Sequence, residues 1–460
     1  MAKSENRLEI GPVAFLVAGL MFMEFLDGSI LPTAAPTIAR SFHTLSEQIG
    51  ICATSYMVTI VILIPISAWL AEKFGVRKIL FGSITLFVLA SLLCAISTSV
   101  LELTIMRIIQ GIGAATMVPV GRLILMRSVD KSQVIRTISY SVWPALAAPV
   151  IAPVLGGFII AHASWRWIFL INLPIGLFVL LIGIKIVPHI SGGKVERLDW
   201  NGFYGTAISL GFLVFGAAEL GTPHVNILVS LLLIALGVGI GVPTIRHLKR
   251  TEKPLVDLAV MKIQTFQLNS SSGLLFRVSQ NTAPFVLPLM FQDKFGWSPQ
   301  KAGEILFFYM LGNLIFKVFT TPLMKKFAFK SLILWATLTS IPLTLALGIL
   351  GHSLPILWIA ILLFITGGVR SLGMTLYNTI TFADIDQEVM SHANSLSNMV
   401  QQLAAVIAVA AAVIAINVGR AMAGTNYQFT FAFIFAIGML LVSLGRVLAL
   451  PSSAGDSLRN

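Results

Sequence analysis

Charged residues are scarce in this chain. Only 11% of its 460 residues are Asp, Glu, Lys or Arg, whereas 57% are hydrophobic. The mean hydropathy is +0.91. A soluble core cannot use that much apolar surface, but a lipid bilayer can. The composition therefore predicts an all-α protein that crosses a membrane many times, rather than several soluble domains.

Cysteine and the common catalytic motifs are also nearly absent. Cys52 and Cys94 are the only cysteines, and both fall in apolar runs, so we expect two small buried side chains. There is no G-x-x-x-x-G-K-[ST] nucleotide loop and no paired-histidine metal motif. The sequence therefore predicts no enzyme, no cofactor and no metal site.

Windows of about 20 apolar residues predict fourteen membrane spans. These cover residues 12–33, 48–70, 79–98, 101–123, 138–161, 167–187, 203–219, 225–245, 267–290, 301–321, 331–350, 354–378, 395–417 and 427–449. No short apolar segment with a small-residue cleavage site precedes the first span, so we expect that span to be retained. An even number of spans places both termini on one side.

The net charge of +12 follows the predicted loops and does not require nucleic acid as a partner. With both termini in the cytoplasm, most Lys and Arg residues fall in inner loops and at inner span ends. The outer loops and span ends hold few: Arg40, Arg166, Lys294, Lys301 and Arg420. This is the positive-inside pattern of a multi-pass cell membrane protein. Trp165 and Trp167 begin a span, at the level where aromatic rings favour the membrane interface.

Two predicted inner loops resemble each other, which indicates internal repetition. The loops are WLAEKFGVRKIL (69–80) and PLMKKFAFKSLIL (322–334), and the aligned residues are Leu70, Lys73, Phe74 and Arg77 with Leu323, Lys326, Phe327 and Lys330. Two similar bundles in one chain would give this pattern, although two basic inner loops can also look alike by chance.

Four segments resemble motifs of the major facilitator superfamily. ISAWLAEKFGVRK (66–78) is similar to G-x-L-A-D-R-x-G-R-R, with Ala68 and Glu72 as departures, and RIIQGIGAA (107–115) matches R-x-x-Q-G-x-G-A-A. LDGSILPTAAP (26–36) resembles L-D-T-T-I-V-N-x-A-L-P, with Pro32 in place of Asn. APVIAPVLGG (148–157) resembles the antiporter motif G-x-x-x-G-P-x-x-G-G, with Ala148 and Ala152 in place of glycines.

Together with fourteen spans, these motifs resemble the fourteen-span drug:proton antiporters, and among them the MdtD-type exporters. The resemblance implies two six-helix bundles, residues 1–195 and 263–460, with two inserted transmembrane helices in 196–262. It also implies alternating access by rocking of one bundle against the other, in a bacterial inner membrane.

The predicted first half holds three ionisable residues at membrane depth, where a charge costs at least about 2.5–3.5 kcal/mol. Asp27 and Glu24 are three residues apart and share one helix face. We expect them to reach an aqueous cleft and Asp27 to carry a proton or contact substrate; a structural ion pair with a neighbouring span is the alternative. The resemblance ties Arg107 to proton coupling, whereas a purely structural arginine would also fit.

The predicted second half has basic residues at membrane depth and no acid to pair with them. We expect a substrate cavity lined by polar stripes: Arg277, Arg370, Lys317, Gln280, Asn281, Asn313, Tyr377, Asn398 and Gln401, with Gln110 from the first half. An unpaired basic cavity would attract an anion, because arginine binds carboxylates through two hydrogen bonds. Alternatively, Lys317 could reach the inner interface, and Arg370 could pair with an acid across the bundles.

Two further segments are candidates for conformational control. The acidic inner loop 381–395, with Asp384 and Asp386, could form a breakable latch with the basic loop 72–78, or could be an ordinary solvated loop. The basic loop contributes Glu72, Lys73, Gly75 and Arg77 to this gate. In the antiporter-like stretch, we expect kinking and close packing at Pro149, Pro153, Gly156 and Gly157.

The sequence thus predicts a proton-coupled carrier of small organic molecules, with a preference for organic anions such as carboxylates or carboxylate chelators. Its expected partners are the substrate, protons and the lipid bilayer, and we expect a monomer. Multidrug efflux by drug:proton antiport is the alternative. A channel is less favoured, since broken helices and repetition are typical of carriers.

Overall fold

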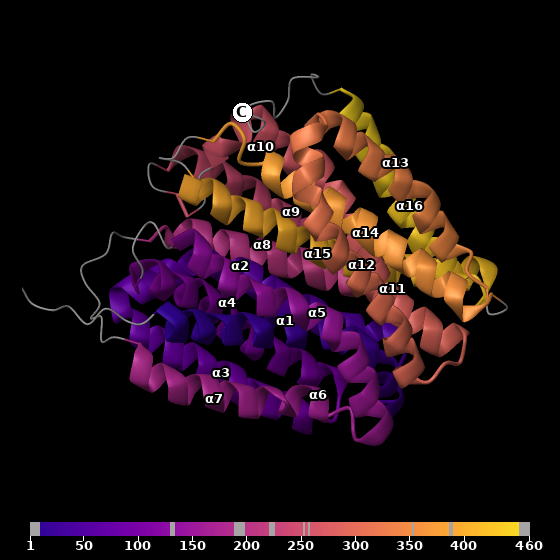
Figure 1. Ribbon diagram of the computed structural model, residues 1–460, viewed down its shortest axis with the longest axis horizontal. Coiled ribbons are helices and arrows are strands. Elements are labelled where there is room, and N and C mark those ends of the chain that lie inside the picture. The colour runs from indigo at the N-terminus through magenta and orange to yellow at the C-terminus, as the bar shows by residue number, and fades with distance from the viewer. Residues whose placement is uncertain are drawn as a thin grey trace, which may run out of the picture.

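The computed structural model describes residues 10–128, 134–187, 198–219, 226–251, 254–255, 258–351, 354–385 and 390–449, and all regular structure in these ranges is helical (Figure 1). The first half comprises α1 (Ile10–Ser41), η1 (Ser46–Ile49), α2 (Gly50–Phe74), α3 (Val76–Ile96), α4 (Val100–Ser128), α5 (Val134–His162), α6 (Trp167–Leu170) and α7 (Asn172–Ile186). An inserted pair follows, α8 (Trp200–Glu219) and α9 (Ile227–Arg250).

The second half begins with a helix that changes its winding along its length. Its elements are η2 (Leu258–Lys262), α10 (Gln264–Leu268), η3 (Asn269–Gly273), α11 (Leu274–Leu289), η4 (Met290–Lys294), α12 (Pro299–Lys326), α13 (Phe329–Gly348), α14 (Ile356–Ile380), α15 (Met390–Ala423) and α16 (Gln428–Leu448). Segments η3 and η4 are π-helical. Such insertions often occur at functional sites.

Local sequence explains where several helices begin and end. Gly75 separates α2 from α3 with φ 94°, a backbone conformation that side chains disfavour. Helix α12 begins with Pro299 after Ser298, whose side chain accepts a hydrogen bond from the Lys301 N–H at 3.2 Å.

Eleven helices in the described residues are long and apolar enough to cross a membrane, and each matches an expected span. The other three expected spans fall on α5, on α8 and on the continuous segment from α10 to η4. The total of fourteen spans remains a prediction. Large apolar side chains such as Leu181, Val318 and Trp335 are exposed, as expected for surfaces that contact lipid.

The two halves share an apolar core at one end of the molecule and have separate cores at the other. The shared core joins α1 residues such as Ile30 to Phe285, Phe291 and Tyr309 of the second half. We call this the closed end. Toward the opposite end, Phe87 belongs to a first-half core and Phe276 to a second-half core. We call that the basic end, after Lys73, Arg77, Lys326 and Lys330, which lie at the helix ends beside the α2–α3 and α12–α13 turns.

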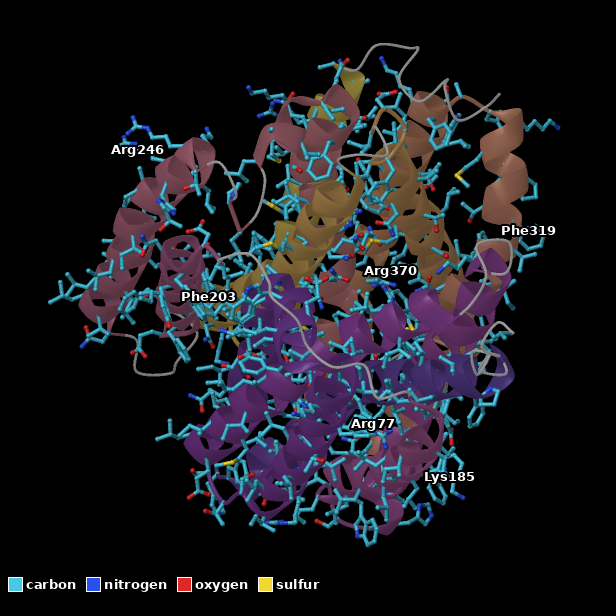
Figure 2. All side chains as sticks on the ribbon, turned by 90° about the vertical axis from the view of Figure 1, so that its left-hand side faces the viewer. Arg77, Lys185, Phe203, Arg246, Phe319 and Arg370 are labelled. Carbon is cyan, nitrogen blue, oxygen red and sulfur yellow. The ribbon has the colours of Figure 1, made fainter. Side chains whose placement is uncertain are left out.

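Helices α5 and α12, α2 and α15, and α1 and α11 pack across the two halves. Helix α8 contacts both α2 and α15, and α9 packs against α8. Figure 2 looks at the molecule from the basic end, with the inserted pair on one flank and the labelled Arg370 near the centre, between the halves. The halves therefore form a wedge whose apolar contact is greatest at the closed end.

Candidate functional site

Asp27 of α1 forms an ion pair with Arg107 of α4 inside the first half. The Arg107 guanidinium also donates to Gln110 Oε1 at 2.7 Å, and Gln110 Nε2 donates to Asp27 Oδ1 at 2.9 Å. The side chains of Asp27 and Arg107 are 0% and 1% exposed. Each charge therefore faces its counter-charge in a dry interior, which satisfies the requirement for keeping ions at membrane depth.

Two residues that the sequence patterns missed complete this network. Asn172 at the start of α7 donates its amide to Asp27 Oδ1 at 2.8 Å. Ser91 of α3 accepts from Gln110 Nε2 at 2.7 Å. The available signal for Asn172 was a single amide in the apolar stretch 168–182. Helices α4 and α7 thus bind both oxygens of one carboxylate of α1, and Ser91 of α3 binds the amides of Gln110 and Asn172.

The expected aqueous cleft at Asp27 is not present in this conformation. Asp27 and Gln110 are fully enclosed, because Arg107 and the amides replace water as partners of the carboxylate. The Arg107 guanidinium also lies over the Tyr56 ring at 4.1 Å. Glu24 is half-buried one turn away, and its Oε2 has no hydrogen-bond partner in the described part of the chain. Glu24 is thus the acid of this helix face whose carboxyl group is not fully satisfied.

In the second half, Arg277 is enclosed among neutral side chains. It donates to Asn269 Oδ1 at 2.5 Å and to Asn378 Oδ1 at 2.7 Å, and it is 1% exposed. Its guanidinium carbon is 5.9 Å from the centre of the Tyr377 ring. No acid pairs with Arg277 within the described residues. Sequence patterns missed both asparagines as partners, since one comes from the π-helical turn and the other from α14.

Arg370 is half-buried on α14 and also binds only neutral groups. Its Nε donates to the backbone carbonyl of Gln280 at 3.3 Å and its Nη2 to Asn281 Oδ1 at 3.1 Å. The Gln280 carbonyl is available because Pro284, four residues later, has no N–H to donate to it. Tyr309 donates to the same carbonyl at 3.4 Å. The proline therefore creates an acceptor that positions the Arg370 guanidinium.

Lys317 is exposed on the face of α12 that points away from the apolar surface. Phe308, Ile315 and Phe319 are exposed on one side of this helix. At 3.6 residues per turn, they lie within about 40° of one another and about 180° from Lys317. Figure 2 places Phe319 at the periphery and Arg370 near the centre. Lys317 is therefore exposed away from this apolar side of α12, and Arg370 is half-buried near the centre of the molecule.

The structure divides the other expected cavity residues into two groups. Asn281, Asn313, Asn398 and Gln401 are partly exposed. Tyr377 and Gln280 are enclosed, at 0% and 4% exposure. Tyr377 is held by Ser272 at 2.7 Å and Ser443 at 3.3 Å, within the second half. In this conformation three of the expected lining residues are enclosed inside the second half: Tyr377, Gln280 and Arg277. Hydrogen bonds within the second half hold them there.

The antiporter-like stretch of α5 packs closely against its neighbours at the closed end. A Cβ on Gly157 would lie 2.5 Å from the Pro299 carbonyl oxygen of α12, and a Cβ on Gly303 would overlap the Pro153 carbonyl. Gly156 faces Ile30 of α1. Pro149, earlier on α5, is half-buried. Missing side chains therefore allow the backbones of the two halves to touch.

Polar contacts also join the halves at the closed end. Glu47 of η1 forms an ion pair with Arg420 of α15. Gln292 Nε2 donates to the Thr33 carbonyl at 2.8 Å. Asp293 is exposed at the same end, but desolvation by the residues around it raises the pKa of its carboxyl group. A hydrogen bond with Ser46 and the charges of Arg40 and Arg420 oppose this increase, and the negative charge of Glu47 adds to it. These residues were not predicted, because no single sequence segment contains both partners.

At the basic end, the candidate gate residues are engaged within the first half. Arg77 donates to the carbonyls of Val187 and Ile184, each at 2.9 Å. The Lys73 ammonium lies 4.4 Å from the centre of the Trp69 ring. Gly75 provides the turn between these residues, and Glu72 precedes them. Asp384 lies just after α14, whereas Asp386 lies outside the described residues. A latch between the two loops thus remains a prediction.

The wedge of two helical halves, with its charges at membrane depth between lipid-facing surfaces, is the architecture of a membrane carrier. The sequence profile of the Major Facilitator Superfamily matches residues 17–409 and 270–457. The chain belongs to that superfamily.

Two relatives at the sequence level come from bacteria. A protein of Pectobacterium atrosepticum named for multidrug resistance, MdtD, is 35% identical over 408 residues, with 88% of this chain and 86% of that protein covered. A protein of Haemophilus influenzae named for transport, HsrA, is 29% identical over 451 residues, with 97% of each chain covered. The expected resemblance to MdtD-type proteins is confirmed.

Solved structures support the fold. A D-xylose–proton symporter matches with a TM-score of 0.68 at 15% identity, covering 97% of this chain and 99% of that one. The xylose transporter XylE from E. coli, in an inward-open conformation, matches with a TM-score of 0.63 at 14% identity, covering 98% and 100%. At such identities the likeness concerns the fold alone.

Proposed function

We propose that this protein is a proton-coupled carrier that moves small organic molecules by alternating access, with a preference for organic anions such as carboxylates or carboxylate chelators. The observation that carries the preference is a difference between the halves. The first half neutralises its deep charge through Asp27 and Arg107, whereas Arg277, Arg370 and Lys317 of the second half have no acidic partner within the described residues. An anion bound beside Arg370 and Lys317 would supply the missing negative charge.

Proton coupling would use the acids of α1. Asp27 is the proposed carrier, and releasing it from Arg107 would accompany its protonation. Glu24 is a second candidate, since one of its carboxyl oxygens is buried without a hydrogen-bond partner. Coupling follows if substrate and proton favour different orientations of the halves, because a ligand shifts a conformational equilibrium only through its differential affinity.

The proposed organisation retains two bundles, residues 1–195 and 263–460, around the inserted helices of 196–262. The basic end is proposed to face the cytoplasm, with both termini there, in a bacterial inner membrane. The structure would then represent a conformation closed on the outside. Loops 72–78 and 381–395 are proposed to meet at the basic end when the halves rock. The proposed assembly is a monomer, without nucleic acid.

Multidrug efflux by drug:proton antiport is the second candidate, favoured by the name of the MdtD relatives. Cavities that bind lipophilic cations would be expected to contain unpaired acids near the exposed site, and Glu24 could serve as one. A channel is less favoured, because the apolar contact at the closed end fills the region between the halves.

Transport into proteoliposomes tests the proposal. Purified protein would be supplied with a panel of carboxylates and of cationic dyes, under a pH gradient imposed in each direction. We expect saturable, gradient-driven movement of carboxylates. Movement of the dyes alone would replace the anion preference with multidrug efflux. Single-channel current without saturation would reject the carrier.

A further inference from the structure

A lateral groove of about 360 Å³ lies where the inserted pair meets the second half. Residues of α8, α9, α15 and η2 line it, including Leu210, Leu213, Val238, Val242, Leu258 and Leu396. Val238 and Val242 are 51% and 43% exposed, so the groove opens toward the lipid side of α9. No residue of the candidate transport site lines it. On α15, Leu396 faces the groove, whereas Asn398 and Gln401 are about 140–200° away around the helix.

The groove wall is mostly hydrocarbon, and its three hydroxyl groups have no free donor. Thr206 donates to the Gly202 carbonyl, Ser209 to the Gly237 carbonyl and Thr244 to the Ile240 carbonyl, each at 2.7 Å. A solute group that accepts hydrogen bonds would find no donor among these hydroxyl groups. An alkyl chain needs none, so the wall fits an acyl chain.

The length of the groove matches one bilayer leaflet. Its lining residues on α9 extend from Gly237 to Leu248. At 1.5 Å per residue this is about 16 Å along the helix. Half of a hydrocarbon core of about 30 Å is about 15 Å. The groove thus runs from the basic end to about the middle of the membrane.

Two lysines stand at the basic end of the groove. Lys249 follows Ile245 by one turn on the groove face of α9, and Lys262 ends η2, whose first residue, Leu258, lines the groove. Both lysines are exposed, and neither has an ion-pair partner in the described ranges. Arg246, by contrast, points outward at the edge of the molecule in Figure 2. Charge and shape therefore complement those of an anionic phospholipid, with two cations at the end of an apolar groove.

A buried carboxylate, that of Asp199, holds together the elements at the basic end of the groove. Asp199, 5% exposed at its side chain, accepts hydrogen bonds from the Gly202 N–H at 2.8 Å and the Leu255 N–H at 3.3 Å, and contacts His247 Nε2 at 2.8 Å. Burial works against the charge, but these bonds outweigh it and lower the pKa of Asp199. The carboxylate thus ties the start of α8, the end of α9 and the segment before η2 together.

We propose that this groove binds an anionic phospholipid from the leaflet at the basic end. One acyl chain fills the slot between α9 and α15, and the phosphate lies at Lys249 and Lys262. The lipid would thereby join the inserted pair to the second half, which assigns those helices a role in placing the second bundle in the membrane.

Lipid binding to the purified full chain tests this, independently of transport. Native mass spectrometry would compare added phosphatidylglycerol with phosphatidylcholine. We expect preferential binding of phosphatidylglycerol. Lys249→Gln and Lys262→Gln should each reduce that preference about fivefold, the effect of one cation near an anionic lipid. Arg446→Gln, which removes an exposed cation from the basic end of α16, is the matched control and should leave the preference unchanged.

A second pair of variants tests the slot itself. Val242→Trp should fill the groove and reduce retention of either lipid, whereas Leu236→Trp, exposed on the other side of α9, should not. Equal binding of both lipids by the native protein would overturn the proposal. So would a Val242→Trp protein that retains lipid as well as the Leu236→Trp control. Lys249 and Lys262 are exposed, so we expect both substitutions to leave the fold intact. An unchanged lipid preference in both variants would therefore overturn the proposed phosphate site.

Discussion

Glu47 of η1 and Arg420 of α15 form an ion pair that joins the two halves of the protein at the closed end. The Glu47 side chain is 5% exposed and that of Arg420 is 28% exposed. Arg420 is held in place by Gln428, which accepts from its Nε at 2.8 Å. A positioned, partly buried pair is worth more than a flexible surface pair, because less side-chain entropy is lost when it forms.

Removing one partner should therefore open the closed end. In Glu47→Gln, we expect a shift of about 1–2 kcal/mol toward the open arrangement, or about 5–30-fold in population. The measurement is thiol labelling of Ala302→Cys, a buried seam residue of α12, in a protein whose native cysteines are serine. Glu102→Gln, an exposed acid of α4 that hydrogen-bonds only within its own turn, is the control. Equal labelling rates in Glu47→Gln and Glu102→Gln would show that the Glu47–Arg420 ion pair does not hold the closed end shut.

Acidification at the closed end should stabilise that closure through Asp293. The residues packed around Asp293 at the closed end desolvate its carboxyl group and raise its pKa, and the negative charge of Glu47 adds to the increase. The closed arrangement therefore binds a proton more tightly than an open one. As pH falls through the raised pKa, closure gains stability, and the gain is complete below the ordinary Asp pKa of about 3.9.

Labelling of Ala302→Cys, measured against pH, checks this. Rates should be divided by those of the exposed control Ser41→Cys, because thiol reactivity itself varies with pH. Asp293→Asn should remove the pH dependence and resemble the acid condition. A pH response that survives in Asp293→Asn would assign the effect to another group.

Because Asp27 and Arg107 form a buried ion pair, the two single variants should each be less stable to unfolding than the double variant. Asp27→Asn leaves a buried arginine unpaired, and Arg107→Gln leaves a buried acid unpaired, so each should cost about 3–5 kcal/mol. The double variant should regain much of that loss. Thermal unfolding measures the three proteins, and additive losses would contradict a direct pair.

Transport separates coupling from stability in the same set. Asp27→Asn and the double variant should both lose gradient-driven transport while substrate exchange continues. Restored stability without restored coupling would assign the proton to Asp27. An unchanged pH dependence in the double variant would transfer that role elsewhere, with Glu24→Gln the next variant to measure.

The seam between α5 and α12 should tolerate no added side chain. Gly303→Ala would place a methyl group against the Pro153 carbonyl, which forces the halves apart at the closed end. We expect faster labelling at Ala302→Cys and impaired transport. Gly438→Ala is the control, since a Cβ there meets open space and alanine favours a helix by about 1 kcal/mol over glycine. Normal transport by Gly303→Ala would exclude this seam from the transport cycle.

Variants of Arg370 should show whether the site attracts a carboxylate by positive charge alone or binds it through two parallel hydrogen bonds. Arg370→Gln should raise the KM for a carboxylate at least tenfold, and Arg370→Lys should restore only part of it, since lysine lacks the planar pair of donors. Phe308→Leu, on the lipid side of α12, is the control. Equal KM values for the lysine variant and the native protein would indicate attraction by charge alone.

The sequence predicted the positions of individual helices well. Hydropathy is a local property, so the boundaries of α3 and α13 follow from the apolar runs 79–98 and 331–350. The close packing of Gly157 was also predictable, since a lost side chain permits approach whatever the partner. The identity of that partner, Pro299, was not.

Partnerships between distant segments required the structure. Asp27 and Arg107 are 80 residues apart in the chain, with helices α2 and α3 between them, and Asn172 reaches the same carboxylate from α7. Sequence alone left Asp27 either in an aqueous cleft or in an ion pair, because the energy of a buried charge depends on what surrounds it in space. The tertiary arrangement selected the ion pair for this conformation.

By itself, the sequence determined that this is a membrane protein of many helices in the major facilitator superfamily. Apolar runs and short motifs are local properties of the chain, so they can be recognised without a structure. Only the tertiary structure decided which charges neutralise one another, which cations of the second half stay without an acid, and at which end the halves meet. Those outcomes depend on electrostatic and packing contacts between residues that are far apart in the chain, and such contacts exist only once the helices are assembled.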